Sequence, residues 1–398
     1  MLLGNRVMLQ PTENQIQDFI RFAGTSRFVW NECKRVCDSL YAESKEYATL
    51  QYLIEHIQEL KYNNPNYTWL QDVPEAVAKQ AIKDLLKAYS RFYRNLNIYG
   101  FDSKEPDKYR PKYKKRGKCK LSFYQRVDNL HKTDDIHIKI TGIKKPVKCR
   151  ALKGVDLPDK IKNPRVSFDG KYWYLSYSVE VESIKITGEY EVEYLGIDLG
   201  VKDLAVFSTG EHFSNINKGD EVRKLTKRLK RLQKQVSRKY ESNVTYDSRG
   251  NKVYHKTNNI KKLEREIKLL NRRIVNIRKT YMYEVIKSAV RTKPQTIVLE
   301  DLNVSGMLQN PKLAKVIQEE SLYEFRRILT YKCELNGINL VIADRWFPSS
   351  KRCSCCGEIK QNLTLKDRIF RCDHCGFTAD RDENGALNLA LYPNLSMQ

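Results

Sequence analysis

The 398-residue chain has no long apolar run and few acidic side chains for its number of basic ones. No apolar segment approaches the roughly 18–20 residues that a membrane-spanning helix needs, so we expect no transmembrane segment and no membrane partner. The opening residues MLLGNRVMLQ show no charged n-region, long apolar h-region or cleavage site, which predicts a cytoplasmic protein. Internal repeats and low-complexity tracts are absent as well. Since 41% of the residues are hydrophobic, the chain can bury a core, and its length favours two or three domains.

The charge balance is strongly positive. Lys and Arg number 72 against 48 Asp and Glu, which leaves a formal charge of +24. A surplus of this size makes the chain repel itself unless a polyanion neutralises it, and the usual polyanion in a cell is nucleic acid. Positive charge that only keeps the protein soluble is the alternative explanation. We therefore expect an intracellular protein that binds nucleic acid.

Half of the ten cysteines lie in one short stretch near the C-terminus. Four of them form two Cys-x2-Cys pairs separated by 15 residues: Cys353, Cys356, Cys372 and Cys375. This spacing is typical of a four-thiolate zinc ribbon, and each pair is followed by a glycine that allows a tight turn. Two disulfides or a redox pair are the alternative, which the expected reducing compartment disfavours. Cys355 is a fifth thiol inside the first pair, so it leaves some choice of ligand open. The segment between the pairs, 362–370, is expected to supply the hairpin of the ribbon.

The N-terminal part reads as helical over residues 13–98, with Thr12-x-x-Gln15 as a capping box at its start. A basic, loop-like stretch follows between residues 102 and 120. Its cations are candidates for nucleic-acid contact: Lys112, Lys114, Lys115 and Arg116. Basic side chains attract phosphate and the interleaved tyrosines can stack on bases, although an ordinary solvated loop explains the pattern equally well.

From residue 133 to 183 the hydrophobic period drops to two. Trp173, Leu175 and Tyr177 alternate with polar positions, which predicts a half-buried strand in a small antiparallel sheet or barrel. A new α/β unit then begins with the apolar strands 194–198 and 204–208.

Residues 221–290 are expected to form two long helices with leucine and isoleucine seams. Residues 221–280 contain 20 basic and 5 acidic side chains, a local charge of +15. Lys227, Arg228 and Arg231 are candidate nucleic-acid contacts on the first helix. A hairpin this basic favours contact with a nucleic-acid backbone over an exposed structural strut.

Three carboxylates stand where they can converge. Asp198 ends the strand LGID, Glu300 ends the strand TIVLE, and Asp382 precedes an expected helix. Together they could hold two Mg²⁺ ions about 3.5–4 Å apart, which can activate water and orient a phosphodiester. Singly, each has a structural explanation: a turn former, a strand-end charge and a helix N-cap. The spare candidates are Asp203, Asp301 and Asp380.

The sequence resembles the transposon-associated TnpB family, relatives of the compact type V CRISPR effectors. The resemblance covers most of the chain and is densest from Tyr194 onward. Its strings are GIDLGVKDLAVFS, IVLEDLNVSGM, YKCELNGINLVIADRWFPSSKRCSCCG and CDHCGFTADRDENGALNLA. The N-terminal match is looser and consists of RFVWNE, VPEAVAKQAIKDLLKAYSRFY and a basic PKYKK segment.

The resemblance implies a multidomain α/β fold. Residues 191–350 and 380–398 would form a RuvC-like, RNase H-type nuclease domain, with Asp198, Glu300 and Asp382 as its metal-binding triad. The zinc ribbon inserted into it, residues 351–379, would be a target nucleic-acid-binding domain. Residues 1–12 and 120–190 would form a wedge-like β-barrel, and residues 13–119 a helical recognition domain inserted into that barrel. The one departure from the family pattern is Gly385, where the family usually has alanine.

The resemblance also implies an activity. Such proteins bind a guide RNA and use two Mg²⁺ ions to cleave DNA paired to the guide, beside a short fixed motif that Gln80 would help to read. The partners would be the guide RNA and target DNA, double-stranded and single-stranded, in a prokaryotic cytoplasm at the nucleoid. One zinc ion would be structural. A CRISPR effector with array-derived guides, a non-cleaving guided regulator and a transposase acting on element ends are the alternatives.

Overall fold

The computed structural model divides the chain into two compact units, Met1–Val181 and Glu182–Gln398. The described residues are 2–99, 110–150, 161–181, 190–309, 314, 318–319, 321–364 and 367–396. Across this part of the chain every helix is too short or too polar to span a lipid bilayer.

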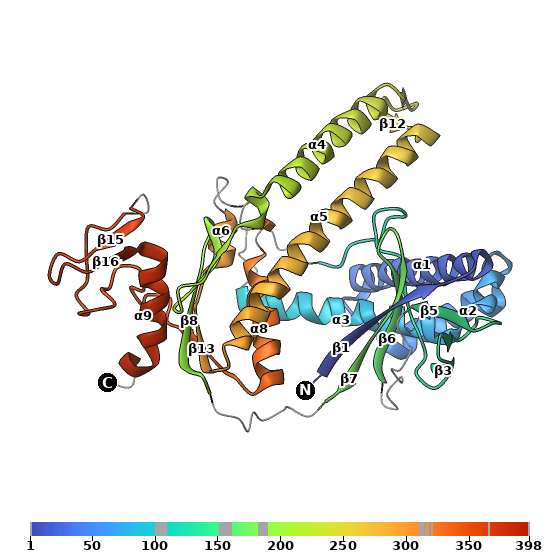
Figure 1. The fold of residues 1–398 in the computed structure, drawn as a ribbon. Coiled ribbons are helices and arrows are strands. Elements are labelled where there is room, and N and C mark those ends of the chain that lie inside the picture. The colour runs from blue at the N-terminus through green and yellow to red at the C-terminus, as the bar shows by residue number, and fades with distance from the viewer. Residues whose placement is uncertain are drawn as a thin grey trace. The chain divides into compact units, whose positions relative to one another are not determined.

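The first unit contains one seven-stranded antiparallel sheet in the order β2-β6-β7-β1-β5-β4-β3 (Figure 1). Its strands are β1 (Leu2–Gln10), β2 (Ser122–Tyr124), β3 (His131–Asp134), β4 (His137–Lys139), β5 (Val147–Arg150), β6 (Ile161–Phe168) and β7 (Trp173–Glu180). On β7 the alternate residues Trp173, Leu175 and Tyr177 are buried, which confirms the expected period of two. The N-terminal strand pairs with both β5 and β7, so residues from both ends of this unit share the sheet.

Helices of this unit pack in two hydrophobic cores. They are α1 (Glu13–Ser44), α2 (Leu50–Asn63), the 3₁₀ helix η1 (Pro65–Asp72) and α3 (Glu75–Tyr99). The first half of α1 buries Phe19 and Phe22 against the sheet, with the Phe19 ring centroid 5.1 Å from that of Trp173. Its second half packs Val29 and Cys33 against α2 and α3. A single long helix therefore joins the sheet to the helical layer.

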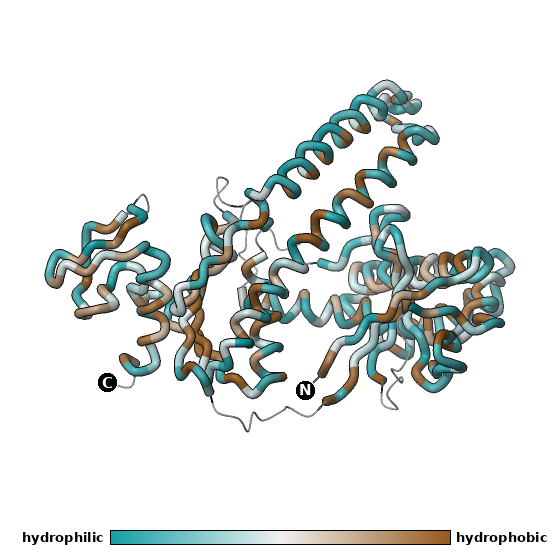
Figure 2. Tube along the Cα trace, viewed as in Figure 1, coloured by the Kyte–Doolittle hydropathy of each residue, from teal (hydrophilic) through white to brown (hydrophobic). Residues whose placement is uncertain are grey.

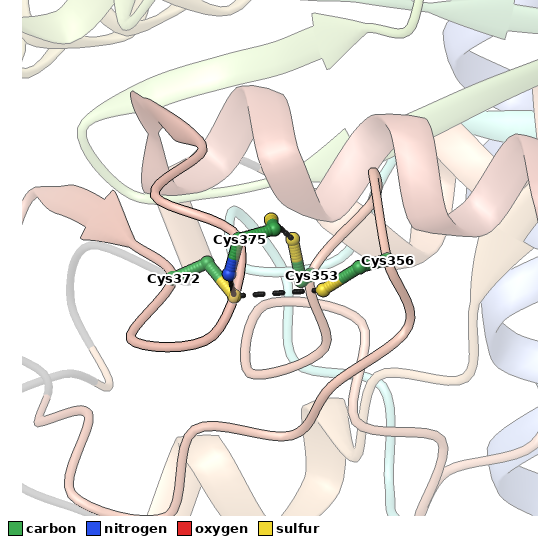
Figure 3. Close-up of side chains that lie close together, drawn as sticks. All are labelled: Cys353, Cys356, Cys372 and Cys375. Carbon is green, nitrogen blue, oxygen red and sulfur yellow. Dashed lines mark hydrogen bonds between the residues drawn. The ribbon is translucent and has the colours of Figure 1, made fainter.

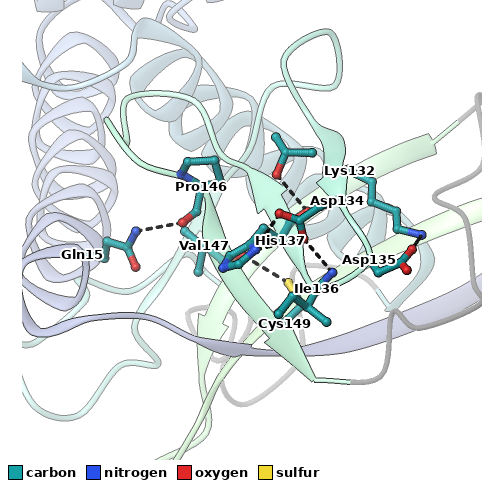
Figure 4. A network of polar contacts seen from close by, with 10 residues as sticks. Gln15, Lys132, Asp134, Asp135, Ile136, His137, Pro146, Val147 and Cys149 are labelled. Atoms are coloured by element: carbon teal, nitrogen blue, oxygen red, sulfur yellow. Dashed lines mark hydrogen bonds and ion pairs between the residues drawn. The ribbon is translucent and has the colours of Figure 1, made fainter.

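The capping box expected at the start of α1 is present. The side chain of Gln15 accepts a hydrogen bond from the Thr12 amide at 3.0 Å, and Thr12 Oγ1 accepts one from the Gln15 amide at 3.5 Å. Gln15 Nε2 also donates to the carbonyl oxygens of Lys145 and Pro146, just before β5 (Figure 4). The same residue therefore caps the helix and ties it to the sheet.

The second unit is built on a five-stranded sheet in the order β10-β9-β8-β13-β14. Its strands are β8 (Val192–Leu199), β9 (Asp203–Phe207), β10 (His212–Ser214), β13 (Pro294–Glu300) and β14 (Asn339–Ala343). β13 is parallel to both β8 and β14, whereas β9 is antiparallel to β8 and β10. Helices α5 (Asn258–Arg291) and α8 (Leu322–Asn336) cover one face, and α9 (Arg381–Ser396) covers the other (Figure 1).

The expected helical hairpin projects from this sheet as α4 (Asp220–Glu241) and α5. Buried Val222, Leu225, Leu270 and Ile274 form its seam, and α4 is hydrophilic over most of its surface (Figure 2). A two-stranded sheet, β11 (Val244–Tyr246) and β12 (Lys252–Tyr254), closes its far end, where the sequence had predicted only a polar turn. The remaining elements are η3 (Ile216–Lys218), α6 (Val304–Gln309), β15 (Ile369–Arg371) and β16 (Thr378–Asp380).

Candidate metal centres and nucleic-acid surfaces

The two Cys-x2-Cys pairs converge on one point (Figure 3). All four sulfur atoms lie within 4.8 Å of one another, and the Cys353–Cys375 and Cys356–Cys372 sulfur pairs are each 3.6 Å apart. A disulfide requires about 2.05 Å, whereas four thiolates about 2.3 Å from a tetrahedral zinc ion lie roughly 3.8 Å apart. The four sulfurs therefore fit a zinc ion and do not form disulfides.

Each pair lies in a turn of the same design. The amide of Gly357 donates to the Cys353 carbonyl at 2.9 Å, and the amide of Gly376 donates to the Cys372 carbonyl at 3.2 Å. Both glycines have positive φ, 84° and 76°, which a residue with a side chain rarely adopts. Hydrogen bonds from the backbone hold the pKa of Cys372 at about 6, below the usual thiol value, which favours the thiolate form that binds metal. Cys355 is exposed and outside the cluster, so the ligand choice left open by the sequence is resolved geometrically.

The hairpin of the ribbon is placed differently from the expectation. β15 pairs with β16, with Arg371 opposite Thr378, so the hairpin encloses the second cysteine pair and does not lie within 362–370. Phe370 is fully buried beside Cys353 and Cys372. One buried aromatic ring is too small a core to hold such a segment without its metal.

Two asparagines fix the first cysteine turn to α9. Asn384 Oδ1 accepts from the Ser354 amide at 3.1 Å, and its Nδ2 donates to the Arg352 carbonyl at 2.7 Å. Asn388 Nδ2 donates to the Ser349 and Arg352 carbonyls at 2.9 and 2.6 Å. Both asparagines are 0% exposed. The sequence reasoning missed them, although polar residues four apart in an apolar helix were a usable signal.

The three candidate carboxylates approach one another on the α9 side of the sheet. Leu299 of β13 pairs with Ile197 of β8, so Glu300 and Asp198 both follow this pair, at the carboxyl ends of parallel strands. Asp382 is the second residue of α9, and a Cβ atom at Gly385, one turn later, would lie 3.4 Å from Asp198 Oδ2. The structure thus brings the three residues together from segments far apart in the sequence.

A glycine makes this approach possible. Gly196 lies two residues before Asp198 and therefore points to the same face of β8. A Cβ atom there would overlap the Ala386 carbonyl oxygen and lie 2.5 Å from the Ala390 amide nitrogen. Because the backbone of α9 rests directly on Gly196, the first turn of that helix reaches Asp198.

The electrostatics match a site that binds a cation. Burial, followed by the charges of Glu300 and Asp382, raises the pKa of Asp198 to about 8. Burial also raises the pKa of Glu300. Carboxylate oxygens are the ligands that Mg²⁺ prefers, and a divalent ion would remove the repulsion that these groups now impose on one another. The donor set therefore fits magnesium.

Arg381 acts electrostatically on the carboxylates, which the sequence reasoning did not predict. Its charge lowers the pKa of both Asp198 and Glu300, although burial and like charges outweigh it. Nη1 donates to the Thr364 carbonyl at 3.1 Å, whereas Nε is buried without a hydrogen-bond partner among the described residues. A basic residue directly before Asp382 in the sequence was the available signal.

The spare acidic candidates have other partners. Asp301 forms ion pairs with Arg326 and Arg345, at 2.9 and 2.6 Å. Asp380 Oδ1 accepts from the Asp382 amide at 2.9 Å, and Lys202 lies between Asp380 and Asp203, at 3.5 and 3.8 Å. Asp382 has a longer ion pair, with Arg368 at 3.7 Å. These contacts leave Asp198 and Glu300 as the better candidates, and Asp382 stays with them because its charge acts on Asp198.

The part of the expected basic loop at 102–120 that the structure describes, residues 110–120, is held by α1; residues 102–109 lie outside the described residues. Trp30 Nε1 donates to the Lys112 carbonyl at 3.1 Å, and Asn31 exchanges two hydrogen bonds with the backbone of Lys114. The Lys114 ammonium lies 3.5 Å from the centre of the Trp30 ring, and burial lowers the pKa of this lysine. Lys112, Lys115 and Arg116 are exposed. The structure thus separates one packed lysine from three cations free to meet a phosphate.

The candidate contacts on α3 and α4 also divide into side chains with protein partners and exposed ones. Gln80 of α3 donates to Asp84 Oδ1 at 3.0 Å, and Arg165 Nη2 contacts both oxygens of Asp84 at 2.7 Å. On α4, Lys227, Arg228 and Arg231 are exposed, but Arg228 forms an ion pair with Glu266 of α5.

Comparisons with known proteins agree along the whole chain. Family matches cover residues 1–46 ("Helix-turn-helix domain"), 176–311 ("Probable transposase") and 323–389 ("Cas12f1-like, TNB domain"). Within the first range the described structure has one strand and one long helix, so the name of that family does not describe the fold seen here.

Two relatives are similar to this chain over nearly its entire sequence, and a third over two thirds of it. "Putative RNA-guided DNA endonuclease InsQ" of Escherichia coli is 30% identical, over 96% of this chain and 90% of that protein. A "Putative RNA-guided DNA endonuclease" of Streptomyces pristinaespiralis is 29% identical, over 95% and 86%. The "CRISPR-associated endodeoxyribonuclease Cas12f1" of Sulfoacidibacillus thermotolerans is 26% identical, over 67% and 61%.

A solved structure shows the same fold at low sequence identity. In the "Cryo-EM structure of the Cas12f1-sgRNA-target DNA complex", the matching chain aligns with a TM-score of 0.57 at 13% identity, over 95% of this chain and 83% of that one. The resemblance of the motifs, the family matches and the full-length relatives lead to one conclusion. The chain belongs to the TnpB family of transposon-associated proteins, which is related to the compact type V CRISPR effectors.

Proposed function

We propose that the protein is an RNA-guided DNA endonuclease that cuts DNA paired to a bound guide RNA beside a short fixed motif. The observation that carries the proposal is the convergence of Asp198, Glu300 and Asp382 on one face of a sheet covered by helices. Relatives that match over nearly the whole chain bear the names of RNA-guided DNA endonucleases. A mixed sheet with these carboxylates supports a RuvC-like, RNase H-type assignment of residues 191–350 and 380–398.

The residues of the site have distinct tasks. Asp198 and Glu300 offer oxygen ligands from the rigid ends of two paired strands, and Asp382 adds a third from α9. Mg²⁺ bound there would activate a water molecule and stabilise the leaving oxygen of a phosphodiester. Arg381 offsets part of the negative charge and keeps the carboxylates close together before the metal binds. A zinc ion held by the four cysteines would fold the ribbon, which Asn384 and Asn388 join to the same helix.

Binding of the guide and the target falls to the basic surfaces. Base pairing reads the sequence in a guided nuclease, so the protein needs phosphate contacts and a short duplex check, not a large base-reading surface. Exposed Lys112, Lys115 and Arg116 on the loop fixed by α1, and Lys227 and Arg231 on α4, supply such contacts. Lys114, packed on Trp30, has a structural share in holding the loop. Gln80 remains the candidate reader of the fixed motif.

The test is to express the protein with its native flanking DNA, purify it and sequence the RNA that accompanies it. One discrete RNA with a constant scaffold and a guide-like segment is expected, and its origin separates a transposon end from a CRISPR array. The purified complex should then cut a plasmid that carries the guide sequence. If only degraded bulk RNA is found and the protein still nicks DNA with Mg²⁺, the guided mechanism is wrong.

A further inference from the structure

A tryptophan on the loop next to the strand of Glu300 has its large apolar ring almost fully exposed to solvent. Trp346 is 86% exposed, whereas Phe347, the next residue of the same loop, is half-buried. The loop directly follows β14, whose last residue, Ala343, pairs with Glu300. The Cα of Trp346 is therefore at most about 16 Å from that of Glu300, a span of a few nucleotides.

Contacts within the loop and with α9 fix the backbone on either side of Trp346. Phe347 packs edge-on against Tyr392 of α9, with ring centroids 4.9 Å apart. The Tyr392 hydroxyl accepts a hydrogen bond from the Asp344 amide at 3.2 Å. Asp344 in turn accepts from the Trp346 amide at 2.8 Å and, through its carbonyl, from the Phe347 amide at 3.0 Å. A flat ring kept exposed on a fixed loop loses little entropy when a partner stacks on it.

Two guanidinium groups line the same open cleft as Trp346. The cleft lies at the ends of β13 and β14, and its charged residues are Arg326, Arg345, Asp301 and Asp344. Asp301 accepts from Arg326 at 2.9 Å and from Arg345 at 2.6 Å, which fixes both cations. Each arginine has further N–H donors beyond the one it gives to Asp301. A stacking surface next to fixed cations is the combination that single-stranded nucleic acid requires.

We propose that Trp346, Arg345 and Arg326 form a subsite for the single DNA strand that enters the site of the three carboxylates. A base stacks on the indole, and the adjacent phosphates face the guanidinium groups. This inference rests on the proposed endonuclease function and adds to it a positioning residue. Trp346 does not touch the scissile bond. It fixes the register of the strand so that one phosphodiester lies at Asp198 and Glu300.

The experiment uses the full protein with its guide RNA and compares Trp346→Ala, Trp346→Phe and Tyr323→Ala. Tyr323 on α8 is a matched control, because it is 70% exposed in the same unit and outside the cleft. Guide loading and target binding should be unchanged in all three variants. The single-turnover cutting rate should fall roughly 5- to 150-fold in Trp346→Ala, the range for one stacked base, and should recover in Trp346→Phe. Tyr323→Ala should cut like the wild type.

Tryptophan fluorescence gives a readout that a structural role would not change. In an Asp198→Ala background, which binds without cutting, a short single-stranded DNA should quench part of the emission, and Trp346→Phe should remove that part. Wild-type cutting by Trp346→Ala, or loss of guide loading in place of cutting, overturns the subsite while leaving the endonuclease function intact. Absence of guided cutting in the wild-type protein overturns the proposed function itself.

Discussion

The two candidate metal centres of the second unit are built in opposite ways. The four cysteines come from 23 consecutive positions, 353–375, and their sulfurs already lie within 4.8 Å of one another. The three carboxylates come from β8, β13 and α9, separated by about a hundred residues in one case, and they repel one another. The ligands of the expected zinc site can be recognised from their spacing in the sequence. The carboxylates proposed to bind magnesium are brought together only by the fold of the whole unit.

The difference agrees with the role proposed for each centre. A four-thiolate site is closed, so its metal can only stabilise the ribbon. The three carboxylates are only half-buried, so they remain partly open to solvent. The stored repulsion at Asp198 costs stability in the metal-free protein, which is the usual trade-off at a functional site. Asn384 and Asn388 connect the two centres through α9.

The largest expected effect is the loss of cutting when a carboxylate is removed. Asp198→Ala or Glu300→Ala should abolish guided cleavage, because the metal loses a ligand, while guided DNA binding survives. Gel-based cleavage with a parallel binding assay measures both. Asp220→Ala, at an 83% exposed side chain at the start of α4, is the control and should cut normally. Full cutting by either active-site variant would show that the site assignment is wrong.

Two glycines test how closely α9 must approach the sheet. Gly196→Ala places a methyl group in the backbone of α9, so the helix and Asp382 must shift; we expect a cost of roughly 1–3 kcal/mol or more and at least a hundredfold loss of cutting. Gly385→Ala meets only ordinary contacts, at 3.4 Å from Asp198 Oδ2. It should stabilise the helix by up to about 1 kcal/mol and retain cutting. Thermal unfolding and cleavage rates measure the pair, and similar behaviour of both variants would contradict the packing described here.

Removal of zinc should affect the other centre first. Without metal, the ribbon at 353–375 should unfold, and cleavage should fall more than RNA binding, because the ribbon lies beside α9. Hydrogen exchange of this segment, with the zinc content measured, follows the change. Cys356→Ser should release zinc, whereas Cys355→Ser should keep one zinc per chain, since Cys355 lies outside the cluster. Unchanged cleavage in verified metal-free protein would refute the prediction.

Sequence reasoning succeeded where the signal is local. Periodicity and residue spacing predicted four features that the structure contains: the cysteine cluster, the capping box at Thr12 and Gln15, the alternation on β7 and the helical hairpin. Asp198, Glu300 and Asp382 were chosen as strand-end and helix-start acids, and the structure brings them together. Their roles as ligands remain predictions.

What could not be predicted depends on tertiary packing. No pattern in the sequence indicates that the backbone of α9 packs directly on Gly196. The hairpin of the ribbon was misplaced because β15 and β16 are only three residues long and pair across the second cysteine turn. Lys114 looked like its basic neighbours, and only the fold shows it packed on Trp30.

The smallest expected effect is on the pH dependence of stability, which should have opposite signs at the two centres. Asp198 has a pKa of about 8 in the metal-free folded protein against about 3.9 when unfolded, so the folded state holds an extra proton between these values. Stability should therefore decline as pH rises from about 4 to about 8, by roughly 2 kcal/mol once partial solvent access has reduced the full shift. Asp198→Asn should remove this decline, and Mg²⁺ should raise the wild-type melting temperature at pH 8 more than that of the variant.

The zinc ribbon should respond in the opposite direction, because protons compete with zinc for thiolates, so acidification releases the metal and unfolds the segment. Melting curves with and without Mg²⁺, combined with hydrogen exchange of residues 353–375, follow the two centres in the same sample. Parallel loss of both centres on acidification would contradict the charge repulsion assigned to Asp198. Opposite responses to pH would show that the cysteine site and the carboxylate site, both in contact with α9, are each stable over a different range of pH.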